Sequence, residues 1–91
     1  MEEVFRQDMG FSFREWKTVT ATRLIRLVEK YPEKQDKIES VLVRLQYLRV
    51  REITKFLVTL FLLSKEVPEA LELVPEPDVV KKWMETGGND E

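Results

Sequence analysis

A long stretch without glycine or proline most constrains the fold of this chain. Residues 33–67 contain neither residue, and apolar side chains recur through them at the i, i+3, i+4, i+7 spacing of an amphipathic helix. The apolar stripe consists of Ile38, Val41, Leu42, Leu45, Leu48, Ile53, Phe56, Leu60 and Leu63. This spacing predicts one long central helix over residues 36–65, roughly 45 Å in length at 1.5 Å per residue.

The most apolar part of this stretch, residues 56–63, has two other interpretations. Its Val, Phe and Thr residues favour a β-strand, but the lack of glycine and proline on both sides favours a helix. A membrane-spanning helix needs about 20 apolar residues, and four charged residues lie between positions 49 and 55. We therefore expect a helix and no membrane partner.

The second half of the predicted central helix is apolar nearly all round. Val58, Phe61 and Leu62 lie opposite the core stripe, where a helix of a small monomer is normally polar. Two short C-terminal helices cannot cover so much apolar surface, so we expect a partner chain to do so. The predicted partner interface consists of Ile53, Leu57, Val58, Phe61 and Leu62.

Start and stop signals divide the rest of the chain into shorter helices. Ser12 and Glu15 form a capping box, with Phe11 and Trp16 placed as a hydrophobic staple, and Pro32 ends this helix near Tyr31. The short connection 32–35 predicts an antiparallel hairpin with the central helix. A short helix closed by Gly10 is expected before the helix that begins at Ser12. Pro68 begins one short helix, and Asp78 or Pro77 begins a last one, which is stopped by Gly87 and Gly88.

These elements predict an all-α fold. We expect a single domain over residues 1–91, an antiparallel helical hairpin with one long central helix and two short C-terminal helices, forming a small helical bundle. The ends, 1–10 and 87–91, are expected to fray. The aromatic residues Phe13, Trp16 and Trp83, with Met84, occur at helical spacing and are expected in the core rather than in a ligand pocket.

Composition excludes several kinds of chemistry. The chain has no cysteine and no histidine, so disulfides, thiolate metal sites and histidine-based catalysis are ruled out. We find no catalytic, cofactor-binding or metal-binding pattern and expect a protein that is not an enzyme. The charged N-terminus lacks the apolar run of a signal peptide, which favours a cytoplasmic location. The high charged fraction and single Asn are typical of heat-stable proteins, and also of ordinary charge-rich helical proteins.

The charge is unevenly distributed. Residues 14–55 carry 11 basic and 6 acidic side chains, whereas residues 56–91 carry 3 basic and 8 acidic ones. Helical spacing gathers the basic residues into two stripes: Arg23, Arg26 and Lys30, then Arg44, Arg51 and Lys55 with Tyr47 beside them. Such stripes can contact nucleic acid or an acidic protein partner. They can also be a solvated face that the acidic C-terminal third neutralises.

Arg49 and Glu52 fall within the apolar stripe of the predicted central helix. Either the two side chains reach water at the edge of the core, or they form a polar pair that fixes the register of an interface.

The function that these observations favour is a non-enzymatic interaction or assembly module, either a small subunit of a larger complex or a homodimer. The alternative is a nucleic-acid-binding protein that uses the two basic stripes. Residues 48–57 resemble the first helix of a helix-turn-helix, but no glycine turn follows Leu57 and Pro68 would fall inside the recognition helix. We therefore infer no family from the sequence.

Overall fold

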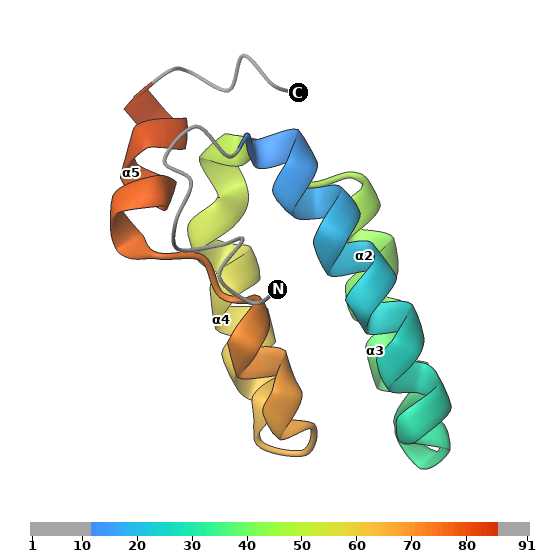
Figure 1. The fold of residues 1–91 in the computed structure, drawn as a ribbon. Coiled ribbons are helices and arrows are strands. Elements are labelled where there is room, and N and C mark those ends of the chain that lie inside the picture. Colours follow the sequence, from blue (N-terminus) through green and yellow to red (C-terminus); the bar gives the residue numbers. More distant parts are fainter. Residues whose placement is uncertain (1–11, 86–91) are drawn as a thin grey trace.

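The computed structural model describes residues 12–85, and every regular element in that range is helical (Figure 1). The elements in chain order are α2 (Phe13–Lys30), the 3₁₀ turn η1 (Pro32–Lys34), α3 (Gln35–Gln46), η2 (Val50–Glu52), α4 (Ile53–Ser64), η3 (Pro68–Leu73) and α5 (Pro77–Glu85). The predicted all-α class is confirmed. The short helix expected before Gly10, the staple residue Phe11, the stop at Gly87 and Gly88, and the frayed ends all lie outside the described residues.

Helix α2 begins and ends where the sequence predicts. The Ser12 hydroxyl accepts a hydrogen bond from the Glu15 backbone N–H at 3.0 Å, and the Glu15 carboxylate accepts one from the Ser12 N–H at 3.0 Å. This reciprocal pair satisfies two donors at the helix start that have no partner within the helix. At the other end, the Tyr31 N–H bonds to the Leu27 carbonyl and Pro32 opens η1. The short turn returns the chain, so α2 and α3 form the expected antiparallel hairpin (Figure 1).

The prediction of one long central helix is wrong, because the chain turns within residues 36–65. Helix α3 ends at Gln46 and α4 begins at Ile53, and the two helices run in opposite directions from the corner that joins them (Figure 1). We call residues 47–52 the α3–α4 corner. The longest dimension of the molecule is 38 Å, which is shorter than the predicted 45 Å helix.

Charge burial explains the position of this break. In an unbroken helix Arg49 and Glu52 would lie on the core stripe, and burying two charges costs far more than a few backbone hydrogen bonds. At the corner both side chains are exposed, while Leu48 and Val50 are buried instead. The Lys17 ammonium donates a 3.0 Å hydrogen bond to the Leu48 carbonyl and so satisfies one corner backbone group. Both side chains therefore reach water, as in the first of the two alternatives given for Arg49 and Glu52, and they do not form a buried pair within this chain.

The two short C-terminal helices are confirmed, although the first is a 3₁₀ helix. Pro68 occupies the first turn of η3, and η3 packs along α4. Helix α5 then buries Val79 and Trp83 against the end of the bundle near the start of α2.

The core is centred on Trp16, which is fully buried. Its indole N–H donates a 2.9 Å hydrogen bond to the Leu73 carbonyl, which ties α2 to the end of η3. The rings of Phe13, Phe56 and Trp83 surround it at centroid distances of 5.9, 6.0 and 5.7 Å. The prediction that Phe13, Trp16 and Trp83 are core residues is confirmed. Met84, in contrast, is 46% exposed.

Candidate functional site

The five predicted interface residues lie at different depths on α4. Ile53 is fully buried in the core, as its place on the apolar stripe predicted, so its assignment to a partner surface is wrong. Leu57 is half-buried, and Val58, Phe61 and Leu62 are 53%, 48% and 59% exposed. Three large apolar side chains on one short helix therefore face outward.

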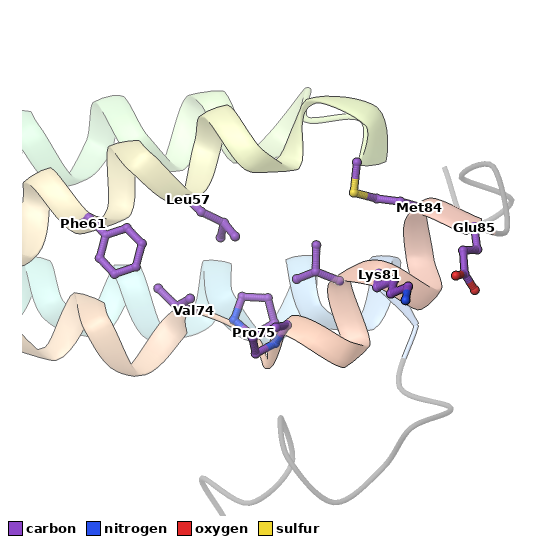
Figure 2. Close-up of a pocket in the computed structure, with 9 residues that line it drawn as sticks. Leu57, Phe61, Val74, Pro75, Lys81, Met84 and Glu85 are labelled. Atoms are coloured by element: carbon purple, nitrogen blue, oxygen red, sulfur yellow. The ribbon is translucent and has the colours of Figure 1, made fainter.

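A groove runs between α4 and the segment that leads into α5 (Figure 2). Leu57 and Phe61 extend from α4 toward Val74 and Pro75, which form the opposite wall (Figure 2). The groove encloses about 620 Å³. Its full lining is Leu57, Phe61, Val74, Pro75, Pro77, Val80, Lys81, Met84 and Glu85. Only Lys81 and Glu85 are charged, so the floor and walls are apolar.

A second hollow lies on the other flank of α4, between α4 and α3. It encloses about 560 Å³ and contains Leu62, but charged and hydroxyl side chains make up most of its wall. The lining residues are Asp36, Lys37, Ser40, Val41, Thr59, Leu62, Leu63, Lys65 and Glu66. Phe61 therefore lines the first groove and Leu62 lines this hollow, so the exposed apolar face of α4 lies between the two.

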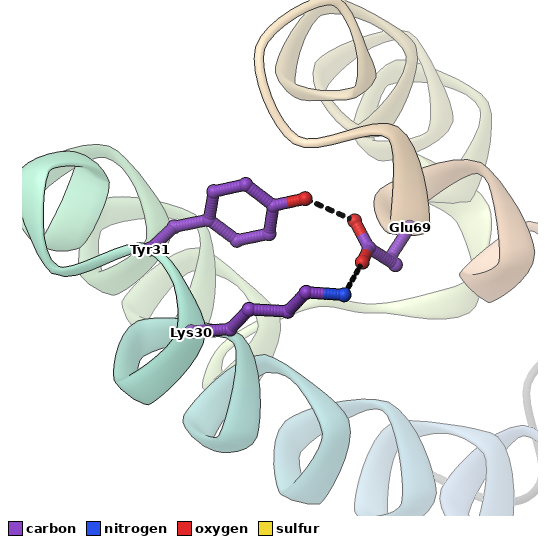
Figure 3. A network of polar contacts seen from close by, with 3 residues as sticks. All are labelled: Lys30, Tyr31 and Glu69. Atoms are coloured by element: carbon purple, nitrogen blue, oxygen red, sulfur yellow. Dashed lines mark hydrogen bonds and ion pairs between the residues drawn. The ribbon is translucent and has the colours of Figure 1, made fainter.

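The basic stripe on α2 is partly neutralised within the molecule. Lys30 forms an ion pair with Glu69 of η3, and the Tyr31 hydroxyl donates a 2.7 Å hydrogen bond to the same carboxylate (Figure 3). These contacts, from Lys30 first, lower the pKa of Glu69 from its ordinary 4.5 to about 2. Arg23 is half-buried, whereas Arg26 is exposed. This stripe is thus split between an internal contact and the solvent.

A second acidic residue completes a polar bridge at this end of the bundle. Lys34 and Lys37 contact the two carboxylate oxygens of Glu66 at 2.8 and 2.5 Å. Hydrogen bonds from these lysines lower the pKa of Glu66 from 4.5 to about 2. The turn between α2 and α3 is therefore joined to the turn after α4 by opposite charges. Neutralisation by the acidic C-terminal third, one of the alternatives given for the stripes, is observed for Lys30; Lys34 and Lys37 lie outside both stripes.

The second basic stripe is brought together at the α3–α4 corner. Arg44 lies in the last turn of α3, Arg51 in η2 and Lys55 in the first turn of α4, and all three side chains are exposed. Tyr47 follows α3 directly and is 78% exposed, more than any other large apolar or aromatic side chain of residues 12–85. These four residues form the basic corner.

Sequence reasoning missed one wall of the groove. Val74, Pro75, Val80 and Met84 come from a different part of the chain, and only tertiary packing places them beside Phe61. Within residues 12–85, no group of acidic side chains could hold a metal ion, and no helix is long and apolar enough to cross a bilayer.

Comparison with protein-family models, with curated proteins and with solved structures gave no match to this chain. Its functional interpretation therefore depends on the surfaces described above.

Proposed function

We propose that this chain is a non-enzymatic assembly module that pairs with a second copy of itself through the outer face of α4 and the adjoining groove. The observation that carries the proposal is the outward placement of Val58, Phe61 and Leu62 beside an apolar groove. Apolar area of this kind is stabilised when another surface removes it from water.

Three properties favour a second copy as the occupant. The surface holds both projecting side chains, Val58 and Leu62, and a groove, so a two-fold relation can place each copy's projections in the other's groove. Helix α4 carries a single charge, Lys55, so two copies bring few like charges together.

The charges at the rim of the groove also suit a two-fold contact. Lys81 and Glu85 lie one helical turn apart on α5 and have opposite charges. In an isologous interface residue i contacts residue j and residue j contacts residue i. Lys81 can then pair with Glu85 of the partner subunit, and Glu85 with Lys81 of the partner subunit.

Light scattering on a size-exclusion column tests the pairing. We expect the wild-type chain to elute at about twice its 10.8 kDa mass, and Phe61→Glu to elute as a monomer with unchanged helix content. The matched control is Ile25→Glu on α2, because Ile25 is 53% exposed but lies away from the groove. A wild-type monomer at high micromolar concentration, or equal dissociation by Ile25→Glu, would contradict the proposal.

Charge exchange at the rim tests the two-fold geometry. Lys81→Glu and Glu85→Lys should each weaken the dimer, because each one places like charges opposite each other. The double variant should restore the wild-type dissociation constant, because it restores opposite charges in both contacts. A dimer that is insensitive to both single changes would place α5 outside the interface.

A further inference from the structure

The α3–α4 corner has more positive charge than its surroundings. Residues 40–65 contain five basic side chains and one acidic side chain, Glu52, in a protein whose net charge is −2. The break between the helices folds four of the five, Arg44, Arg49, Arg51 and Lys55, onto or next to the same short turn. An excess of positive charge in so small an area attracts polyanions.

The charges of the basic corner are not consumed by internal ion pairs. Arg44, Arg51 and Lys55 are exposed and form no ion pair with any of residues 12–85. At the opposite end of the bundle, by comparison, the cluster of lysines is engaged by Glu66 and Glu69. The two basic regions therefore differ. The lysines that contact Glu66 and Glu69 join separate elements of the fold, whereas the basic residues of the corner face the solvent.

Tyr47 adds a feature that charge alone does not explain. Its ring is 78% exposed, and its side chain makes no hydrogen bond or ring contact with residues 12–85. An exposed ring contributes little to the fold, but a flat aromatic surface among arginines can stack on a nucleotide base. Guanidinium groups beside it can hold phosphate oxygens in bidentate geometry.

We propose that the basic corner, Arg44, Tyr47, Arg51 and Lys55, binds single-stranded nucleic acid. Stacking needs an unpaired base, which a duplex does not offer. The corner also presents a turn rather than a long helix, so it has no element of the kind that enters a major groove. An acidic protein surface would satisfy the arginines but would leave the Tyr47 ring unused.

This surface adjoins the proposed dimer face at Lys55. Lys55 points away from Leu57 and the groove, since two residues along a helix differ by about 200° in direction. It shares a flank of α4, however, with Val58 and Leu62, three and seven residues further on. The other three residues of the basic corner precede α4. Nucleic-acid binding should therefore persist in Phe61→Glu, so the two proposals can fail separately.

Fluorescence anisotropy with labelled oligo-U and oligo-dT at low salt tests the inference. We expect binding that weakens steeply with salt. Arg44→Glu combined with Arg51→Glu should lower affinity at least tenfold and reduce the log–log salt slope by about 1.4, the value for two lost single-strand contacts. Tyr47→Ala should weaken binding roughly 5- to 150-fold, the contribution of one stacked base, whereas Tyr47→Phe should bind as the wild type does.

The matched control is Arg26→Glu combined with Lys65→Glu. It changes the net charge by the same amount at exposed positions outside the corner, so it should have a much smaller effect on binding. Equal loss in this control would show general attraction and overturn the proposal. So would no binding by the wild type, tighter binding to poly-glutamate than to oligonucleotide, or binding unaffected by Tyr47→Ala. Circular dichroism of each variant separates lost binding from lost folding.

Discussion

The two ends of the α2–α3 hairpin are joined to α4 and η3 by opposite kinds of contact. Near the start of α2, Trp16 is buried among aromatic rings and donates its indole N–H to the Leu73 carbonyl. Near the end of α2, Lys30 and Tyr31 hold the carboxylate of Glu69 on a more accessible surface (Figure 3). Helix α2 and η3 are thus connected through a buried aromatic residue at one end and through an ion pair at the other.

The aromatic end and the charged end should contribute differently to stability. A buried aromatic ring removes a large apolar area from water, and its contacts with neighbouring rings add to that gain. Exposed ion pairs gain little, because water and salt screen them and ordering long side chains costs entropy. We infer that the aromatic end supplies most of the stability. The charged end selects which turns lie opposite each other and makes stability depend on pH.

The largest effect is expected from removing Trp16. Trp16→Ala should lower the free energy of unfolding by about 3–5 kcal/mol, because it leaves a cavity at the centre of the core and leaves the Leu73 carbonyl without its donor. Urea titration followed by circular dichroism measures the change. Tyr31→Phe, which removes only the hydroxyl that bonds to Glu69, should have a much smaller effect. Similar losses in the two variants would contradict the assignment of stability to the aromatic end.

A smaller change in the free energy of unfolding, this time an increase, is expected from a substitution at Thr20. The Thr20 hydroxyl is fully buried and has no hydrogen-bond partner among residues 12–85. Because Val has nearly the same shape and no polar atom to leave unpaired, Thr20→Val should raise the free energy of unfolding by about 1 kcal/mol. Thr18→Val is the control, since the Thr18 hydroxyl is exposed and already bonds to the Arg14 carbonyl at 3.1 Å. A loss of stability in Thr20→Val would indicate that its hydroxyl is satisfied in solution.

Local signals predicted most of the helix ends. The capping box at Ser12 and Glu15 is observed, as are the breaks at Pro32 and Pro68. The α3–α4 corner escaped prediction because it contains neither glycine nor proline. Its signal was the pair of charges, Arg49 and Glu52, on a stripe that had to be buried. Two charges in the core sector of a long amphipathic pattern are better explained by a break than by a buried pair.

The candidate surfaces were predictable only where they depend on one helix. Helical phase alone placed Phe61 and its neighbours outside the core stripe. It also placed Ile53 on that stripe, so the assignment of Ile53 to a partner interface went against the phase. The wall formed by Val74 and Val80, like the pairing of Lys30 with a residue 39 positions away, depends on how separate elements pack. No periodicity within one segment contains that information.

The smallest effect, and the one that tests the charged end, is a dependence of stability on pH. Glu66 and Glu69 have pKa values lowered from 4.5 to about 2 in the folded protein by hydrogen bonds from lysines and Tyr31. Between those values the unfolded chain binds protons that the folded protein does not, so acidification favours unfolding. The contribution of both carboxylates is present above about pH 4.5 and is lost as the pH falls toward 2. Melting temperatures of the wild type should therefore decline across this window.

Replacing both carboxylates by Gln should flatten that decline and identify its source. The Glu66→Gln, Glu69→Gln double variant should melt below the wild type at neutral pH, because the lysines lose their charged partners. The two curves should converge below about pH 2, as the wild-type carboxylates become protonated in the folded protein too. Glu29→Gln, which removes an exposed carboxylate from α2, should leave the difference between neutral and acid pH unchanged. If the double variant declined as steeply as the wild type, the acid sensitivity would belong to other groups, and the charged end would be no more than a surface contact.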